Sequence, residues 1–392
     1  MPKIAQAPWL PQPAAFPAGV HAYSWADILG IGSLRAIFNV RFGAHGFPED
    51  TTMSRHCIVP PYMLRSIAQH GDDRQRALAW STLTDSEQIR GQRRVLSPLA
   101  SWAATATGTK RRTIYDARGE YELPGHLVRG EGSPKGNDAA VDEAYDGSGA
   151  TYDFFFRVFA RSSIDGRGMR LDSTVHYGVD YDNAFWNGRQ MVYGDGDGRI
   201  FRRFTKAIDV IAHELTHGIT QHEAALAYRG ESGSLNESFS DVFGSLVKQH
   251  RRGQPAREAD WLIGRGLFKP SVEARAIRSM KEPGTAYDDP VLGKDPQPGH
   301  MRDYVRTAED NGGVHINSGI PNRAFYELAV RLGGKAWEKA GRIWYKTLTD
   351  KLRPNSNFRD AVNLTVQAAA ELFGLNSLEQ KAVREAWNEV GL

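Results

Sequence analysis

The chain has 392 residues, of which 41% are hydrophobic, 10% aromatic and 24% charged. This length predicts two or three domains, and the composition excludes a wholly disordered chain or a small disulfide scaffold. The single cysteine, Cys57, excludes an intramolecular disulfide and any multi-cysteine metal site. The net charge of +3 argues against a general nucleic-acid binder. No apolar run approaches the roughly 20 residues of a transmembrane helix.

Residues 1–52 differ from the rest of the chain. Five prolines fall within the first 17 residues, and an apolar stretch at 26–40 is interrupted by Asp27 and Arg35. A secretory signal peptide has a basic start, an uninterrupted apolar run and a small-residue cleavage site. We therefore expect no signal peptide, and interpret 1–52 as an N-terminal extension, either disordered or a misassigned start upstream of Met53.

The following stretch, 53–105, has the character of a short folded piece followed by a linker. The apolar, proline-stiffened sequence from Ile58 to Leu64 is expected to be extended. Apolar residues after it predict short helices. Basic runs at 89–94 and 110–112 indicate a solvent-exposed linker of the kind that proteases cut.

The remainder divides into a β-rich half and a helical half. Short runs bounded by Gly, Asn and Asp predict strands at 112–117, 121–128, 173–177 and 189–193. Apolar residues at three- and four-residue spacings predict helices at 139–160, 206–224, 235–251, 318–332, 335–349, 356–373 and 378–389. This order predicts an α+β fold with two lobes.

The motif that carries most chemistry is His-Glu-Leu-Thr-His at 213–217. Residues four apart lie on one face of a helix, so His213 and His217 can bind one metal ion. Glu214 lies beside them and can accept a proton from a metal-activated water. The alternative is that both histidines are merely solvated on a helix surface.

A third metal ligand is expected, because catalytic zinc of this type takes three protein ligands. Glu237 follows His213 by 24 residues on the next predicted helix. Its alternative role is structural, as the partner of Ser234 in a capping box. Asp241, one turn later, and Asn236 are candidates for orienting the two imidazoles.

His315 is a further candidate, because it follows a Gly-Gly turn in the stretch 310–319 just ahead of a predicted helix. Backbone geometry rather than an apolar face would then position it. By itself, His315 could equally be an ordinary loop histidine.

Taken together, these clusters resemble the thermolysin family of neutral zinc metalloproteases. The resemblance covers most of residues 111–392. Its segments are 183–188, 191–198, the helices around His213 and Glu237, 278–280, 310–319 and 354–358.

The resemblance implies a set of roles at the reaction centre. His213, His217 and Glu237 would bind zinc, a ligand set that is thermolysin's own, and Glu214 would be the general base. The oxyanion of the tetrahedral intermediate would be stabilised by His315 and Tyr228, with Asp310 orienting His315.

It also implies how peptide and protein substrates bind. Asn183 and Ala184 would pair with the substrate backbone along an edge strand, and Arg278 would hold a substrate carbonyl on the leaving-group side. Cleavage is expected on the amino side of bulky apolar residues. The positions matching the apolar pocket are Phe201, Phe204, Val210, Ile263 and Ile277.

Calcium is the clearest departure from the family. Lys248 and Arg265 stand where the family's double-calcium site has acidic ligands, and cations cannot bind calcium. They are expected to pair with Asp209 and Asp260 instead. Arg275 also replaces an acid of another calcium loop, so we expect little dependence on calcium.

The pro-region is the second departure, because the sequence around Cys57, Pro60 and Pro61 resembles the protealysin subgroup with its short pro-region. A pre-extended Pro-Pro segment would lose little entropy on binding in the substrate cleft as an intramolecular inhibitor. Cys57 would either reach zinc as a thiolate or be a small buried hydrophobe. The pro-region is expected to end between Arg94 and Arg112.

The resulting prediction is a monomeric zinc endopeptidase made as a zymogen. Its divisions are an extension (1–52), a propeptide and linker (53–105), a β-rich lobe with the His213 helix (106–222) and a helical lobe (223–392). A zinc aminopeptidase, a catalytically silent zinc-stabilised domain and a nucleic-acid binder are weaker alternatives. Secretion is usual in the family that the sequence resembles, which favours a secreted protein. The expected lack of a signal peptide favours instead a cytoplasmic location or leaderless export.

Overall fold

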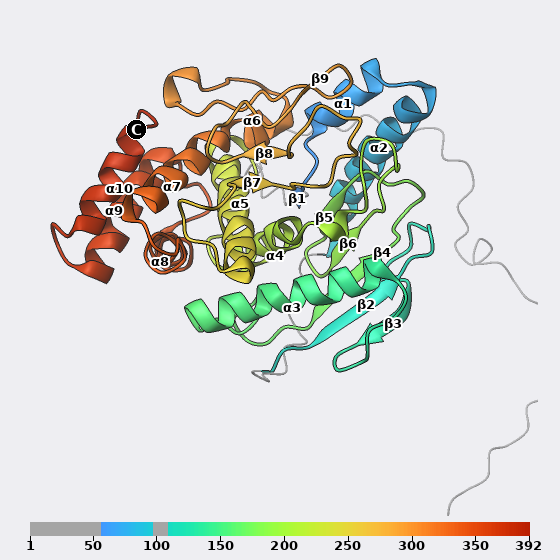
Figure 1. Ribbon diagram of the computed structural model, residues 1–392, viewed down its shortest axis with the longest axis horizontal. Coiled ribbons are helices and arrows are strands. Elements are labelled where there is room, and N and C mark those ends of the chain that lie inside the picture. Colours follow the sequence, from blue (N-terminus) through green and yellow to red (C-terminus); the bar gives the residue numbers. More distant parts are fainter. Residues whose placement is uncertain (1–55, 97–108) are drawn as a thin grey trace, which may run out of the picture. The chain divides into compact units, whose positions relative to one another are not determined.

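A computed structural model describes residues 56–96 and 109–392 (Figure 1). The predicted extension 1–52 and most of the stretch from Arg94 to Arg112, where the pro-region is expected to end, lie outside the described residues. Two helices follow the first described strand: α1 (Pro61–His70) and α2 (Asp73–Leu96). The basic run at 89–94 is therefore helical rather than a loop, because Arg, Gln and Leu are strong helix formers.

One six-stranded mixed sheet forms the β-rich lobe. The strand order is β1-β5-β6-β4-β2-β3, so the N-terminal strand β1 occupies one edge. The pairs β2–β4 and β4–β6 are parallel, and the pairs β1–β5, β5–β6 and β2–β3 are antiparallel. The strands are β1 (His56–Cys57), β2 (Arg112–Asp116), β3 (His126–Gly130), β4 (Leu171–Val175), β5 (Ala184–Trp186) and β6 (Met191–Tyr193).

Helix α3 (Ala139–Phe159) packs against β2 and β4 (Figure 1). Its first turn is capped by Asp138, whose side chain accepts hydrogen bonds from the backbone N–H groups of Ala140 and Val141. Helix α4 (Ile208–His222) packs against α3, β5 and, most extensively, α5 (Gly230–Arg252). α4 thus joins the sheet to the helical lobe.

The α4–α5 contact depends on Gly244. A Cβ atom at this position would lie 2.5 Å from the Asp209 backbone oxygen, so no larger residue allows the same approach. Since α4 and α5 carry the candidate metal ligands, this close contact sets their separation.

Helices make up most of the second lobe. They are α6 (Asp310–Asn317), α7 (Gly319–Leu332), α8 (Ala340–Lys346), a π-turn (Thr347–Lys351), α9 (Phe358–Phe373) and α10 (Leu378–Asn388). Short pieces connect them: β7 (Leu262–Ile263), β8 (Arg278–Ser279), β9 (Asp288–Asp289), β10 (Gly293–Lys294) and the 3₁₀ turns Phe204–Lys206 and Met301–Asp303. The predicted two-lobed α+β fold is confirmed.

Two further expectations differ from the structure. The strand expected at 121–128 forms only from His126, because Pro124 cannot donate to a ladder and Gly125 has φ +84°. The extended propeptide sequence ends at Pro60, since Pro61 begins α1 at the helical position that favours proline. In addition, strand β5 was not predicted from periodicity, because its three residues are too few to show one.

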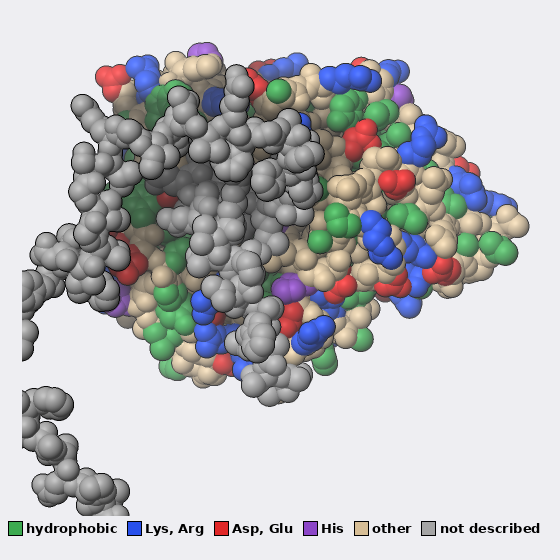
Figure 2. Space-filling model, turned by 180° about the vertical axis from the view of Figure 1, so that it is seen from behind, with side chains coloured by type: hydrophobic (Ala, Val, Ile, Leu, Met, Phe, Trp, Pro, Cys, Tyr) green, Lys and Arg blue, Asp and Glu red, His purple; other side chains and the backbone are tan. Residues whose placement is uncertain are grey.

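The described residues contain no helix that combines the length and apolarity required to cross a bilayer. On the face seen in Figure 2, basic and acidic side chains are intermixed outside the grey atoms.

Candidate active site

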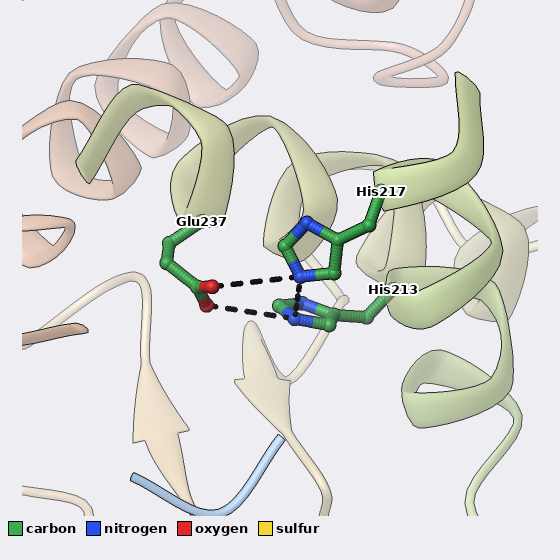
Figure 3. Close-up of side chains that lie close together, drawn as sticks. All are labelled: His213, His217 and Glu237. Carbon is green, nitrogen blue, oxygen red and sulfur yellow. Dashed lines mark hydrogen bonds and ion pairs between the residues drawn. The ribbon is translucent and has the colours of Figure 1, made fainter. Parts of the chain in front are cut away.

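Three buried side chains from α4 and α5 converge on one point (Figure 3). His213 Nε2 and His217 Nε2 lie 3.0 Å apart, and each lies 3.5 Å from one Glu237 carboxylate oxygen. Donor atoms at about 2.0–2.1 Å from a tetrahedral zinc ion lie about 3.3 Å from one another. The donor set and its spacing therefore fit a zinc ion bound by two imidazoles and a carboxylate.

The outer nitrogen of each imidazole has a partner that directs Nε2 inward. His213 Nδ1 lies 2.8 Å from Asp241 Oδ1, and His217 Nδ1 lies 2.9 Å from Asn236 Oδ1. Ser240 Oγ, 3.0 Å from His217 Nδ1, is an additional contact that was not expected from the sequence. Such partners fix the tautomer and ring orientation of metal-binding histidines.

Asp241 is held in turn by Arg278 and Asn322. Arg278 donates two hydrogen bonds of 2.7 Å to the carboxylate, and Asn322 donates one of 2.8 Å. Burial raises the pKa of Asp241, but the charges of Arg278 and His213 and their hydrogen bonds outweigh it and hold the pKa below its usual range. Asn322 lies 81 residues from Asp241, and nothing in the sequence indicated it.

The structure does not contain the capping box considered for Glu237. Helix α5 begins at Gly230, so Ser234 is inside the helix and its hydroxyl donates to the Gly230 carbonyl. Glu237 is fully buried beside the two histidines.

Glu214, which follows His213 on α4, is fully buried. The Trp186 backbone N–H donates to its Oε2 at 3.0 Å. Strand β5 thereby orients the carboxylate that follows His213 in the chain.

His315 approaches the metal ligands from α6. Asp310 accepts hydrogen bonds from His315 Nδ1 at 2.6 Å and from the His315 backbone N–H at 2.8 Å. Tyr228 lies 3.0 Å from His315 Nε2, and its hydroxyl donates to Glu237. Burial lowers the pKa of His315, but the Asp310 and Glu237 carboxylates outweigh it and raise that pKa.

A left-handed backbone series turns His315 toward the site. Gly312 and Gly313 have φ values of +86° and +78°, and Asp310 and Asn311 precede them with φ values of 52° and 53°. Glycine tolerates this conformation at no steric cost, which explains the Gly-Gly pair.

The N-terminal segment 56–59, which begins with strand β1, contacts the residues of the site. The Ile58 N–H donates to the Ala184 carbonyl at 3.2 Å, and Arg278 donates to the Ile58 carbonyl at 3.1 Å. Asn183 accepts from the Val59 N–H at 3.0 Å and donates to the Val59 carbonyl at 3.3 Å. The residues expected to bind substrate backbone thus contact the chain's own N-terminal segment.

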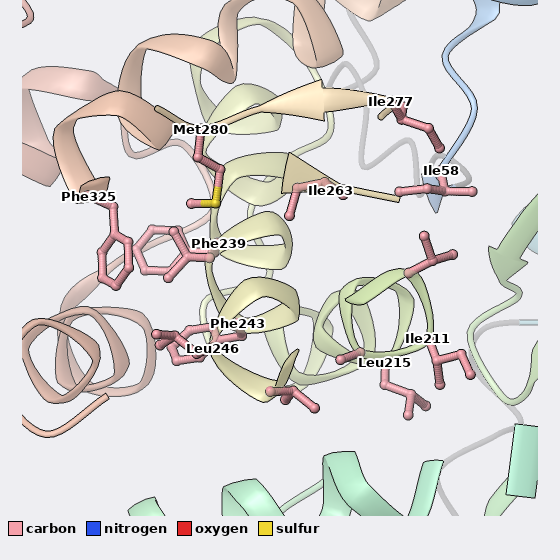
Figure 4. Close-up of a cluster of buried hydrophobic side chains, with 14 of the residues drawn as sticks. Ile58, Ile211, Leu215, Phe239, Phe243, Leu246, Ile263, Ile277, Met280 and Phe325 are labelled. Carbon is pink, nitrogen blue, oxygen red and sulfur yellow. The ribbon is translucent and has the colours of Figure 1, made fainter. Parts of the chain in front are cut away.

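The Ile58 side chain is fully buried in the large hydrophobic cluster that also contains Ile263, and it lies near Ile277 (Figure 4). The expected pocket residues all belong to this cluster and are fully buried: Phe201, Phe204, Val210, Ile263 and Ile277.

Cys57 packs in a second, smaller hydrophobic cluster with Phe185 and Val192. Within the described part of the chain, the group that could hold a metal consists of His213, His217 and Glu237 and does not include this cysteine. The His315 Nε2 atom lies 3.2 Å from the Cys57 backbone oxygen.

Lys248 occupies the position that the sequence associated with calcium. Its Nζ atom lies 2.9 Å from Asp209 Oδ2 and 2.8 Å from Asp260 Oδ1, and it donates to the Leu262 carbonyl. Arg265 lies 3.3 Å from Asp260 at the surface. A buried ammonium therefore stands among three oxygen ligands.

Two consecutive segments of the chain match models of two protein-family domains. Residues 100–221 match the thermolysin metallopeptidase catalytic domain, and residues 224–392 match the thermolysin metallopeptidase alpha-helical domain. The chain belongs to the thermolysin family of metallopeptidases. It is a zinc metalloendopeptidase of the protealysin type, made as a zymogen.

Two relatives and one solved structure define this relationship. The chain is 54% identical over 337 residues to an extracellular metalloprotease of Pectobacterium carotovorum subsp. carotovorum, covering 86% of this chain and 96% of that protein. It is 42% identical over 287 residues to thermolysin of Alicyclobacillus acidocaldarius subsp. acidocaldarius, covering 71% of this chain and 50% of that protein. The precursor of protealysin, a metalloproteinase from Serratia proteamaculans, matches with a TM-score of 0.79 and 53% identity, covering 86% of this chain and 99% of that one.

Proposed function

We propose that the site hydrolyses internal peptide bonds on the amino side of bulky apolar residues. The observation that carries this proposal is the placement of Ile58. Its side chain is buried in the same hydrophobic cluster as Ile263 and Ile277, while Ala184 and Arg278 hold its backbone. A substrate residue of similar shape and polarity would gain the same burial.

Glu214 is the proposed general base and proton carrier. Zinc bound by His213, His217 and Glu237 would polarise the scissile carbonyl and activate a water. Glu214 takes a proton from the attacking water and delivers it to the leaving nitrogen. The hydrogen bond from Trp186 N–H keeps the carboxylate in position for both transfers.

His315 and Tyr228 are the proposed donors to the developing oxyanion. Asp310 accepts from His315 Nδ1, which leaves Nε2 directed at the site. Both side chains are buried, and hydrogen bonds to a developing charge are stronger away from water. Arg278 holds the carbonyl on the leaving-group side.

The propeptide is the proposed intramolecular inhibitor. Strand β1 covers the edge strand β5, and α1 begins directly after Pro60. Pro60 is extended and Pro61 starts the helix, so the two prolines fix the turn from cleft to helix. Cys57 contributes a backbone carbonyl and a buried side chain rather than a metal ligand.

We further propose stability without calcium, because the Lys248 ammonium already neutralises Asp209 and Asp260. Action outside the cell is proposed from the relative described as an extracellular metalloprotease. A monomer is the proposed working unit, since one chain supplies every residue of the site. The proposed divisions are 1–52, 53–105, 106–222 and 223–392.

Cleavage of peptides blocked at both ends tests the proposal. The processed, zinc-loaded enzyme should cut an internal X–Leu or X–Phe bond at least about tenfold faster than X–Asp or X–Lys, as an apolar pocket requires. Cleavage of free amino-terminal peptides alone would instead indicate an aminopeptidase. A preference for Asp or Lys after the cut bond would refute the proposed specificity.

A further inference from the structure

The propeptide strand has the direction and register of a substrate across the reaction centre. In the antiparallel β1–β5 pair, His56 lies opposite Trp186 and Cys57 lies opposite Phe185. The contacts continue past the strand, because Ile58 N–H donates to the Ala184 carbonyl and Asn183 binds the backbone of Val59. Backbone addition to a sheet edge fixes register, because each N–H and C=O has one partner.

The bond between Cys57 and Ile58 lies at the point where chemistry is proposed. His315 Nε2, the proposed oxyanion donor, is 3.2 Å from the Cys57 carbonyl oxygen. The nitrogen of the same peptide bond donates to the Ala184 carbonyl at 3.2 Å. One group thus faces the carbonyl that water would attack, and another holds the nitrogen that would leave.

The side chain after this bond also meets the proposed specificity. Ile58 is fully buried in the apolar cluster, and Arg278 donates to its carbonyl at 3.1 Å. Asn183 binds both the N–H and the C=O of Val59. Every contact proposed for a substrate on the leaving-group side is therefore made by the chain itself.

We propose that the enzyme hydrolyses its own Cys57–Ile58 bond within one molecule as an early processing step, an inference that rests on the proposed function. Water oxygen adds to the Cys57 carbonyl carbon, and the C–N bond breaks. Glu214 carries the two water protons in turn to the Ile58 nitrogen. The products are a Cys57 carboxylate and an Ile58 α-ammonium group, with no redox change.

The cut does not by itself free the cleft. The new chain start at Ile58 remains attached to α1 and α2. Three ion pairs join these helices and the turn between them to the catalytic lobes, and the tether keeps the effective concentration of the product high. The pairs are Arg65–Glu309 at 3.2 Å, Arg74–Asp180 at 2.6 Å and Arg199–Asp72 at 2.8 Å. A nicked form with its cleft still occupied is expected to accumulate before mature enzyme appears.

Mass spectrometry of the zinc-loaded full chain tests the proposal. Peptides that begin at Ile58 and peptides that end at Cys57 should appear together, at a first-order rate independent of protein concentration. They should be absent in Glu214→Gln. Active enzyme mixed with the Glu214→Gln chain should not produce the Ile58 terminus in the latter, and its efficient formation there would overturn cleavage within one molecule.

Matched variants at Ile58 separate this step from general activity. Ile58→Asp should slow formation of the new terminus at least about a hundredfold, because an apolar pocket rejects a charge. Ile58→Leu should stay within about tenfold of the original rate. Thermal unfolding of both variants verifies that they fold.

Hydrogen exchange gives a measurement that needs no turnover. In the zinc-free chain, the Ile58 and Val59 amides should be protected, and Ile58→Asp should expose them. Free exchange of both amides in the original chain would overturn the register. If the enzyme cuts blocked peptides but no Ile58 terminus forms, only the inference about the Cys57–Ile58 bond fails. If the enzyme cuts neither the blocked peptides nor its own Cys57–Ile58 bond, the proposed function fails as well.

Discussion

The buried ammonium of Lys248 provides the sharpest test of calcium independence. Lys248→Met keeps a side chain of similar length but removes the ammonium beside Asp209, and leaves Asp260 paired only with Arg252 and Arg265. Asp209 is 1% exposed, and the Asp260 side chain is 13% exposed. Removing one partner of such a buried pair costs about 3–5 kcal/mol of unfolding free energy. At about 2 °C per kcal/mol for a chain of this size, the melting temperature falls by about 6–10 °C.

A surface charge from the same cluster serves as the control. The Arg265 side chain is 61% exposed, so its pair with Asp260 contributes less than about 1 kcal/mol. Arg265→Ala should therefore lower the melting temperature by less than about 2 °C. If Lys248→Met loses no more stability than Arg265→Ala, the ammonium is not the structural substitute for calcium.

Lys248→Glu should create calcium dependence. The variant presents a third carboxylate beside Asp209, Asp260 and the Leu262 carbonyl, and such oxygens are calcium ligands. Saturating calcium at about a hundred times its Kd would add about 2.7 kcal/mol, which raises the melting temperature measurably. The original chain should not respond. If a calcium-specific chelator lowers the melting temperature of the original chain by several degrees while zinc stays bound, the proposed calcium independence is refuted.

Two further predictions concern the β-rich lobe. The first concerns His176, whose two ring nitrogens each lie 2.8 Å from a carboxylate oxygen, of Asp195 and of Asp138. Hydrogen bonds and charges from these two acids raise the pKa of His176 to about 9, because they outweigh burial, which lowers it. The folded value exceeds the unfolded value of about 6.5, so its contribution is complete below that pH and lost as pH rises through about 9. In urea unfolding, the gap between the original chain and His176→Asn should be larger at pH 6 than at pH 10; equal gaps would contradict this. The second prediction concerns Gly194, where a Cβ atom would lie 2.0 Å from the Tyr181 backbone oxygen. Gly194→Ala should therefore lower the free energy of unfolding, measured by calorimetry, by about 1–3 kcal/mol. An unchanged free energy of unfolding would show that the loop adapts freely to the added methyl group.

Local spacing was sufficient to predict the helices that carry the metal ligands. The four-residue separation of His213 and His217 and the apolar positions around them are properties of one helix. The start of α5 was not predictable in the same way. The turn from Gly230 to Ser234 contains poor helix formers, and packing against α4 and α6 stabilises it instead.

Contacts between distant residues explain what the sequence left open. Whether Glu237 was a cap partner or a site residue depended on where α5 begins. Asn322 reaches Asp241 across 81 residues of sequence, and β1 meets β5 across more than a hundred. An apolar, proline-stiffened sequence predicts an extended segment, but the register that brings Cys57 to His315 is set by tertiary structure.

Replacing Glu214 with Gln tests the zinc-peptidase mechanism most directly. The amide keeps the size of the carboxylate and can still accept from Trp186 N–H, so the fold and one bound zinc per chain should be retained. With the processed enzyme, cleavage of a blocked internal peptide should fall by about a thousandfold or more, since no group remains to move the proton. A variant that keeps its zinc and cuts the peptide within about tenfold of the original rate would contradict the assignment of Glu214 as the general base.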